Sequence, residues 1–319
     1  MTQRSRLQSS HPSLLHERPY TTAFARNDLE LLCAVLIWSF NVTVVKVGLR
    51  EVGPLAYNIV RFTCASAVLL IVARLSEGSL LVERRDVGRL LLLGLVGHTL
   101  YQICFIEGIA RTTASSTSLL FGSSPVVIAL ISRLVGHERV GLYGAAGALL
   151  GFLGVYLIVG RSAGAEAAGE PSRIFGGSAL AGNLLIVAAV VCWGGYTVMA
   201  RGLLKRYSPL RVIALSLSFG TVLLVPIALP SAVHQDWASV SGLTWAGLAY
   251  SFLFALVLSY LIWYRSVKRV GNLRTAVYSN LVPVFGTMFG VVLLHERLTA
   301  GLGVGACCIL AGILLTRRT

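Results

Sequence analysis

The chain has 319 residues, of which 55% are hydrophobic and 13% are charged, whereas an ordinary soluble domain carries about 25% charged residues. This composition excludes a single soluble domain, because one core could not bury so much apolar side chain. The net charge of +14 does not indicate nucleic-acid binding either, because the Lys and Arg residues lie in short connections between apolar blocks and not along one face.

Residues 1–27 are polar and form, by expectation, a disordered tail without the apolar run of a cleavable signal peptide. The apolar blocks that follow have the length of a helix of about 20 residues, which crosses the ~30 Å hydrocarbon core of a bilayer. We therefore predict an all-α membrane protein of about ten transmembrane helices. The expected spans are 29–47, 55–75, 90–109, 116–135 and 140–159, then 179–199, 212–229, 243–263, 275–294 and 301–315.

The two sets of five spans are related by an internal repeat. Pro125 recurs as Pro283, and the His-Glu-Arg triplet that starts at His137 recurs at His295, both at an offset of 158; Trp38 recurs as Trp193 at an offset of 155. Because five is an odd number of spans, the second repeat enters the membrane upside down. The chain is therefore predicted to contain two inverted five-helix repeats, 28–160 and 179–319, joined by a linker over 161–178.

Orientation follows from the distribution of positive charge, since cytoplasmic loops are enriched in Lys and Arg. With a cytoplasmic N-terminus, that side of the membrane holds 19 Lys and Arg residues and the other side five. We expect a multi-pass protein of the cytoplasmic (inner) membrane with both termini in the cytoplasm.

Polar side chains inside spans are candidate substrate-binding positions, because they are costly in hydrocarbon unless they face a cavity or a partner. In the first span this points to Asn41, whose repeat equivalent is Tyr196 in the sixth span, next to Thr197. The alternative for Asn41 is a hydrogen bond to a neighbouring helix.

The third span carries His98, Tyr101 and Gln102 at helical spacing, so we expect them on one face of a central cavity. The repeat equivalents of Tyr101 and Gln102 are Ser259 and Tyr260, and Tyr260 joins the candidate site. His98 changes charge near neutral pH, so proton coupling through it is a hypothesis. The alternative is a neutral histidine held by hydrogen bonds from Tyr or Gln.

Arg61 lies about 10 Å into the second span, at 1.5 Å per residue from Pro54. A guanidinium there needs a partner, and Glu107 in the third span is the expected one, as a structural ion pair. In the alternative, Arg61 or Lys46 attracts a carboxylate or phosphate of the substrate. Because no carboxylate lies near the middle of a span, zwitterionic, anionic or neutral substrates are favoured over permanent cations.

In the ninth span, Tyr278 and Asn280 are further cavity candidates. Pro125 and Pro283 each remove a helix hydrogen bond, so they are predicted to be gating bends. Glycines recur in the fifth and tenth spans, where they predict close helix packing in preference to dimerisation. They are Gly144, Gly147, Gly151 and Gly154, and Gly301, Gly303, Gly305 and Gly312.

Motifs of catalysis or cofactor binding are absent from the sequence. There is no phosphate loop, no HExxH, no GxSxG and no paired carboxylate in a span. The six cysteines have neither CxxC nor metal-ligand spacing. We therefore expect no enzyme, no cofactor and no metal site, and no direct use of ATP.

Four features in fixed order carry a family resemblance. They are the segment from Ile37 to Asn41 followed by Lys46, Pro54, the pair Arg61-Phe62, and the twofold proline with its later His-Glu-Arg triplet. Over almost the whole of 29–317 the chain resembles the EamA-like branch of the drug/metabolite transporter (DMT) superfamily. The resemblance implies inverted repeats, cytoplasmic termini and a central cavity. It also implies export or uptake of amino acids, metabolites or drugs without ATP hydrolysis.

We therefore expect a secondary transporter, an exporter of an amino acid, related metabolite or drug, that works by alternating access. Its expected partners are a small-molecule substrate and the lipid bilayer, with the chain a monomer or homodimer. The alternatives are a membrane scaffold or receptor that moves no substrate, and a channel, although no filter segment is seen.

Overall fold

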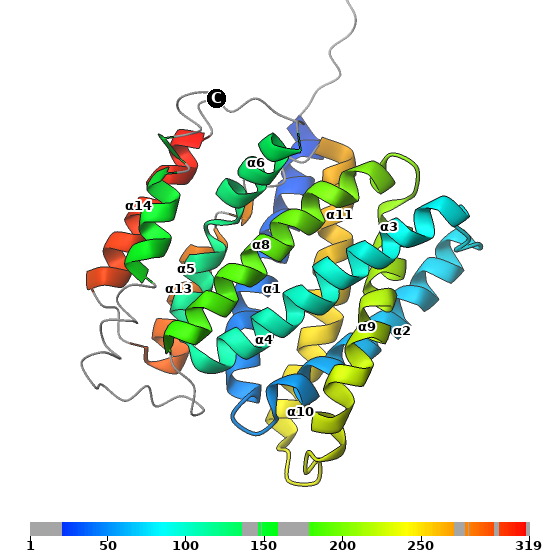
Figure 1. Ribbon diagram of the computed structural model, residues 1–319, viewed down its shortest axis with the longest axis horizontal. Helices are drawn as coiled ribbons and strands as arrows, with labels where there is room; N and C mark the ends of the chain where they lie inside the picture. The colour runs from blue at the N-terminus through cyan, green and yellow to red at the C-terminus, as the bar shows by residue number, and fades with distance from the viewer. Residues whose placement is uncertain are drawn as a thin grey trace, which may run out of the picture.

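The computed structural model describes residues 21–135, 146–147, 149–158, 179–270, 278–279, 281–296 and 300–316. Within these ranges the chain forms helices joined by short turns, without a strand (Figure 1). The first repeat holds α1 Thr21–Gly48, α2 Pro54–Glu77, α3 Arg84–Gly94, η1 Leu95–Leu100, α4 Tyr101–Arg111, α5 Ala114–Phe121, α6 Ser124–Leu134 and a helix over Leu149–Ile158. The second holds α8 Ala179–Leu204, α9 Pro209–Val233, α10 Gly242–Tyr250, η2 Ser251–Leu258, α11 Ser259–Val270, α13 Val282–Leu294 and α14 Ala300–Thr316.

Seven helical stretches in these ranges are long and apolar enough to cross a membrane, and three shorter apolar helices accompany them. Large hydrophobic side chains stay exposed on their outer faces, among them Ile71, Val222 and Leu149 at 59%, 67% and 72%. Lipid is the solvent that such a surface fits. Helix α1 begins at Thr21, within residues 1–27 that the sequence predicts to be a disordered tail. The linker 161–178 lies outside the described residues.

The helix starts follow from the local sequence. Pro54 and Pro209, which are repeat equivalents, both lie in the first turn of a helix, where a missing N–H costs no hydrogen bond. The Ser208 side chain accepts a hydrogen bond from the Arg211 N–H and so caps α9.

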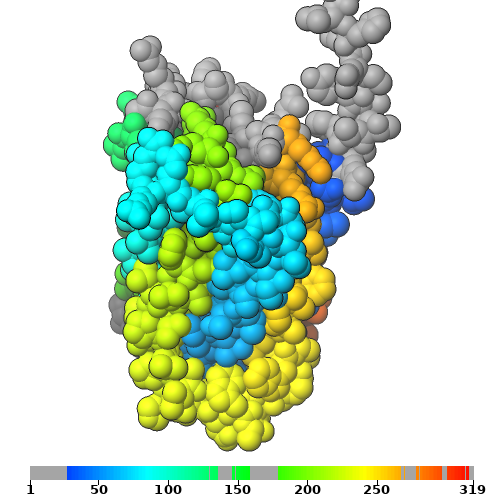
Figure 2. Space-filling model, turned by 90° about the vertical axis from the view of Figure 1, so that its right-hand side faces the viewer, coloured from blue at the N-terminus to red at the C-terminus, as the bar shows by residue number. Residues whose placement is uncertain are grey.

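The bundle has two ends, which we call the N-terminal face, where α1 begins, and the opposite face. At the N-terminal face the end of α2 meets the start of α9, where Arg211 Nε pairs with Glu77 at 3.1 Å. At the opposite face Gln235, after α9, accepts a hydrogen bond from the Gly53 N–H just before α2. The repeat-related helices α2 and α9 are therefore antiparallel, and they lie side by side in Figure 2.

One hydrogen bond marks the symmetry between the repeats. Ser66 Oγ and Thr221 Oγ1 lie 2.7 Å apart, and the two residues are 155 positions apart, which is the repeat offset. Each hydroxyl therefore contacts its own repeat equivalent, as expected on a pseudo-two-fold axis. Buried side chains of α2 and α9 pack on both sides of this pair, among them Leu69 and its equivalent Leu224.

The predicted packing of the fifth span against the tenth is confirmed. A Cβ atom on Gly154 would lie 2.6 Å from the Gly305 carbonyl oxygen, and one on Gly312 would lie 2.6 Å from that of Gly147. Because Gly147 and Gly305, and Gly154 and Gly312, are repeat equivalents, the two contacts are the same contact related by symmetry. Glycine is needed here for the close approach of two backbones.

Candidate functional site

Two π-helical segments interrupt equivalent spans, η1 in the third and η2 in its repeat partner. A π-turn inserts an extra residue and rotates the helix after it, and such segments are frequent at functional sites. The predicted common face of His98, Tyr101 and Gln102 stays a prediction, because η1 ends between His98 and the other two residues. His98 in η1 contacts α9, whereas Gln102 in α4 contacts α2.

Arg61 lies at the centre of a buried polar network and is only 1% exposed. Its Nη2 donates to Gln102 Oε1 at 2.7 Å, its Nη1 to Ser251 Oγ at 3.2 Å, and its Nε to Asn58 Oδ1 at 3.0 Å. Ser251 in turn donates to Asn41 Oδ1. The network joins α1, α2 and α4 of the first repeat to η2 of the second.

The predicted pair of Arg61 and Glu107 is wrong. Glu107 pairs instead with Arg111, one turn further along α4. A single helical turn already brings these two side chains together at the helix end. Arg61 is left with neutral oxygens as its hydrogen-bond acceptors.

Lys46 is engaged by the backbone of its neighbours. Its Nζ donates to the carbonyl oxygens of Ile109 at 2.6 Å and Thr112 at 2.5 Å, at the end of α4. These carbonyls have no partner within their own helix, and a cation is favoured at this end of a helix dipole. The hypothesis that Lys46 attracts an anionic substrate is replaced by a structural role.

Aromatic side chains from both repeats gather around Tyr260, which is 3% exposed. The ring centroids of Trp38 and Trp193 lie 5.8 Å and 6.1 Å from that of Tyr260, both edge-on. Tyr101 completes this group, which we call the aromatic cluster, with its ring centroid 5.6 Å from Trp193. Trp38, Tyr101 and Trp193 are half-buried, although their rings contact buried neighbours.

Tyr196 lies beside the aromatic cluster and is fully buried. Its hydroxyl accepts a hydrogen bond from Tyr264 Oη at 3.0 Å. A Cβ atom on Gly97 would lie 2.0 Å from the Tyr196 ring, so the ring packs directly on the glycine of η1. The Thr197 side chain bonds within its own helix, since its Oγ1 donates to the Trp193 carbonyl oxygen.

His98 is fully buried, and its Nε2 lies 3.1 Å from Ser216 Oγ. The hydrogen-bond partner expected from the sequence was Tyr or Gln, and that expectation is wrong because the ring nitrogen bonds Ser216 of α9. The Tyr196 ring lies edge-on to the imidazole, with centroids 5.0 Å apart. In the described part of the chain, no acidic group shares a hydrogen bond with His98.

The two prolines and the ninth span were also singled out by the sequence. Pro125 and Pro283 lie in the first turns of α6 and α13. Pro125 follows a short break between α5 and α6 within one span, and the role of the two prolines as gating bends stays a prediction. Tyr278 donates to Asp28 Oδ1 at 2.5 Å at the start of α1, on the N-terminal face and away from the aromatic cluster. Asn280 lies outside the described residues.

Asn58, Ser216, Ser251 and Tyr264 belong to the site and were missed by sequence reasoning. Two of them had a local signal, because Asn58 precedes Arg61 by three residues and Tyr264 follows Tyr260 by four, which places each pair on one helix face. Ser216 and Ser251 had none, since a single serine in an apolar span is common.

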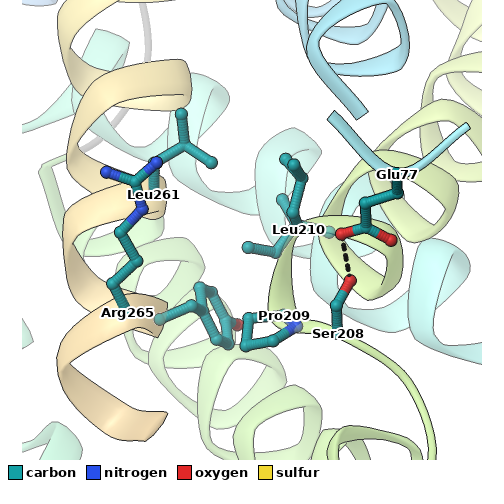
Figure 3. A pocket seen from close by; sticks show the side chains of 8 residues that line it. Glu77, Ser208, Pro209, Leu210, Leu261 and Arg265 are labelled. Carbon is teal, nitrogen blue, oxygen red and sulfur yellow. Dashed lines mark hydrogen bonds between the residues drawn. The ribbon is translucent and has the colours of Figure 1, made fainter. Parts of the chain in front are cut away.

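A pocket of about 230 Å³ opens on the N-terminal face. Arg265 of α11 lies on one side, and Glu77 and Ser208, joined by a hydrogen bond, lie on the other (Figure 3). Tyr264 also lines the pocket. Because the Tyr264 ring stacks on that of Tyr260, with centroids 6.3 Å apart, the pocket borders on the aromatic cluster.

The sequence model of the EamA-like transporter family matches the chain twice, over residues 27–160 and 180–318. The match confirms the resemblance that the sequence motifs indicated. A solved crystal structure, 19% identical, covers 92% of this chain and 98% of its own with a TM-score of 0.63, which shows a shared fold.

Curated relatives are transporters by name. "Uncharacterized transporter YetK" of Bacillus subtilis is 28% identical over 90% of this chain and 86% of its own length. "Probable terminal-alkyne amino-acid exporter" of Streptantibioticus cattleyicolor is also 28% identical, over 90% of this chain and 92% of its own.

Proposed function

We propose that this chain, which belongs to the EamA-like transporter family, is a secondary transporter that moves a small metabolite by alternating access. The observation that carries the proposal is the meeting of both repeats at one site. Trp38, Arg61 and Gln102 come from the first repeat, and Trp193, Ser251 and Tyr260 from the second. A rocking of one repeat against the other changes such a site directly.

The two faces of the bundle differ in a way that supports alternating access. The N-terminal face has the pocket that borders on the aromatic cluster. At the opposite face Lys46 and Glu296 hold the turn between α4 and α5, and Glu51 accepts hydrogen bonds from Ser241. We infer a conformer that is closed at the opposite face.

The N-terminal face is proposed to be cytoplasmic, because the Lys and Arg count of 19 against five favours that side. With the three shorter apolar helices counted as spans, the chain crosses the inner membrane ten times and both termini are cytoplasmic. We propose that it acts as a monomer or homodimer.

An amino acid, a related metabolite or a drug is the proposed cargo, and export the proposed direction. The named exporter among the relatives supports both. Aromatic rings offer flat apolar surface to such a molecule, and ring faces also bind an ammonium group. Proton coupling through His98 remains a hypothesis that the transport assay tests.

Counterflow in proteoliposomes with the purified chain separates the functions. Saturable counterflow of a labelled amino acid, metabolite or drug is the expected result. Flow that does not saturate indicates a channel, and the absence of flow for every compound indicates a scaffold or receptor. Either result contradicts the proposal.

A matched pair of tryptophan variants tests whether the substrate binds at the aromatic cluster. Trp193→Ala is expected to raise KM by about tenfold, which corresponds to about 1.4 kcal/mol of lost binding. Trp245→Ala, which removes a 43% exposed ring of α10 near the opposite face, is the control and leaves KM unchanged. Equal KM values for both variants would place the substrate elsewhere.

A further inference from the structure

Arg61 is a buried cation whose charge no carboxylate offsets in the described part of the chain. Its three recorded hydrogen bonds go to the neutral oxygens of Asn58, Gln102 and Ser251. A guanidinium has five N–H donors, so at least two are free of these bonds. Burying a cation without a counter-ion costs several kcal/mol, by the order of magnitude found for buried ions.

The acidic residues of the described chain are engaged elsewhere. Each of the nine accepts a hydrogen bond or forms an ion pair with a group other than Arg61: Asp28, Glu30, Glu51, Glu77, Glu83, Asp86, Glu107, Asp236 and Glu296. The ionisable side chains around Arg61 are Tyr57, Tyr101 and Tyr260, and a phenol, with an ordinary pKa of about 10, carries no charge at neutral pH. A counter-anion for Arg61 therefore has to come from outside these residues.

Two further buried polar atoms of α2, one of them on the Arg61 partner Asn58, have no hydrogen-bond partner among the described residues. They are Asn58 Nδ2 and Tyr57 Oη, both in fully buried side chains of α2. An unsatisfied buried donor costs about 1–3 kcal/mol. Asn58 Oδ1 accepts from Arg61 Nε, so the free amide N–H₂ lies beside the guanidinium. Together with Arg61 these groups present several donors, the complement of a carboxylate with its two oxygens.

The fold itself does not require a charged residue at this place. At the repeat offset of 155, the equivalents of Tyr57, Asn58 and Arg61 are Val212, Ile213 and Ser216. These side chains are buried in α9 just as their counterparts are in α2. Since the second repeat packs the same position without a charge, the charge in the first repeat serves something other than packing.

Aromatic rings surround the guanidinium. The Arg61 Cζ atom lies 5.6 Å from the ring centroid of Phe62 and 5.8 Å from that of Phe105. Tyr101, which precedes the Arg61 partner Gln102 in α4, is a member of the aromatic cluster. A molecule whose carboxylate reached Arg61 would therefore place its remaining atoms against these rings.

We propose that Arg61, assisted by Asn58 and Tyr57, binds the α-carboxylate of a zwitterionic amino-acid substrate. The aromatic cluster receives the ammonium group and side chain, since ring faces attract both cations and apolar groups. The assignment rests on the proposed transport function and names its substrate class.

The test compares each amino acid with its carboxamide, which keeps the ammonium and side chain and removes the negative charge. Tryptophan fluorescence of the purified full chain, titrated with the common L-amino acids, identifies those that bind. We expect the amide of each to bind at least about tenfold more weakly, equivalent to about 1.4 kcal/mol. Failure of every L-amino acid to bind, or equal affinity for acid and amide, overturns the assignment.

Variants then locate the carboxylate. Arg61→Gln is expected to weaken binding of the acid by about tenfold or more and to leave the amide unchanged. Arg269→Gln, at an exposed Arg that pairs with Glu30 on the N-terminal face, is the matched control and changes neither affinity. An Arg61→Gln protein that binds the acid as tightly as the unaltered chain would refute the role of Arg61.

Tyr57→Phe keeps the proposal testable if Arg61→Gln does not fold. It removes a buried hydroxyl that has no partner, so stability should be retained or improved. The affinity for the amino acid should fall by about threefold or more, and the affinity for its carboxamide should not change. An unchanged affinity for the amino acid would contradict the proposal. Saturable counterflow of a compound that is not an amino acid would leave the transport function standing while this assignment fails.

Discussion

Lys46 and Glu296 hold opposite ends of the same turn, the one that joins α4 to α5. The Lys46 ammonium bonds to carbonyl oxygens at the end of α4, and the Glu296 carboxylate accepts the N–H groups of Ala114 and Ser115 at 2.7 Å and 2.8 Å at the start of α5. A helix end attracts a cation and a helix start attracts an anion. Because Lys46 belongs to the first repeat and Glu296 to the second, the turn ties the two repeats together at the opposite face.

This arrangement predicts that Lys46→Met and Glu296→Gln each lower the free energy of unfolding by about 1–2 kcal/mol, the range for charges at helix ends. Because both side chains hold one turn, the double variant should lose less than the sum of the two. Unfolding in detergent measures all three, with Lys205→Met at an exposed position as control. Strict additivity would show that the two charges act independently.

Packing of the fifth span against the tenth makes a second prediction. Gly154→Ala would place a Cβ atom 2.6 Å from the Gly305 carbonyl oxygen, so the helices must move apart at a cost of about 1–3 kcal/mol. Gly303 lies on α14, the helix that also carries Gly305, but no atom lies within 4 Å of its Cβ position. Gly303→Ala should therefore be neutral or stabilising. The midpoints of thermal unfolding compare the two variants, and similar losses for both would contradict the proposed contact.

His98 gives a third prediction. The ring is fully buried against Ser216 and Tyr196 and has no recorded acidic partner, so it lacks the neighbour that would stabilise a charged imidazolium. We expect His98→Gln to keep the pH profile of transport while lowering stability by about 1 kcal/mol through the altered contact with Ser216. Transport rates measured over a range of pH decide the matter. A profile that flattens in the variant would assign proton coupling to His98.

The opposite face should also loosen in acid. Hydrogen bonds from the Ser241 backbone N–H and hydroxyl lower the pKa of Glu51 below its usual value of 4.5. A carboxyl group with a lower pKa in the folded state stabilises the fold above the unfolded pKa, and this stabilisation is lost as pH falls through the folded pKa. Thermal unfolding followed from neutral pH to below 4.5 should therefore show a smaller acid-induced loss in Glu51→Gln than in the unaltered chain. Equal losses would mean that this contact does not contribute.

The membrane character, the duplication and the inversion of the repeats could be inferred from the sequence, and the family match and the antiparallel α2 and α9 agree with them. These properties depend on quantities that are local or countable. The length of an apolar block is set by the bilayer, the offset between Trp38 and Trp193 is read from the chain, and an odd number of spans reverses the second repeat. The close packing of Gly154 on Gly305 was also predictable, because small residues at helical spacing let membrane helices approach closely.

The partners of the buried polar groups were decided by the tertiary structure alone. Arg61 bonds to Gln102, 41 positions away along the chain, and to Ser251, 190 positions away. Helical periodicity in a sequence does not indicate which distant oxygen atom will lie nearest to a given side chain. Likewise His98 in η1 bonds to Ser216, 118 positions away along the chain. Apolar length specifies how a chain crosses the bilayer, whereas directional hydrogen bonds inside it depend on the rotation and crossing of each helix, and these exist only once all the helices have packed.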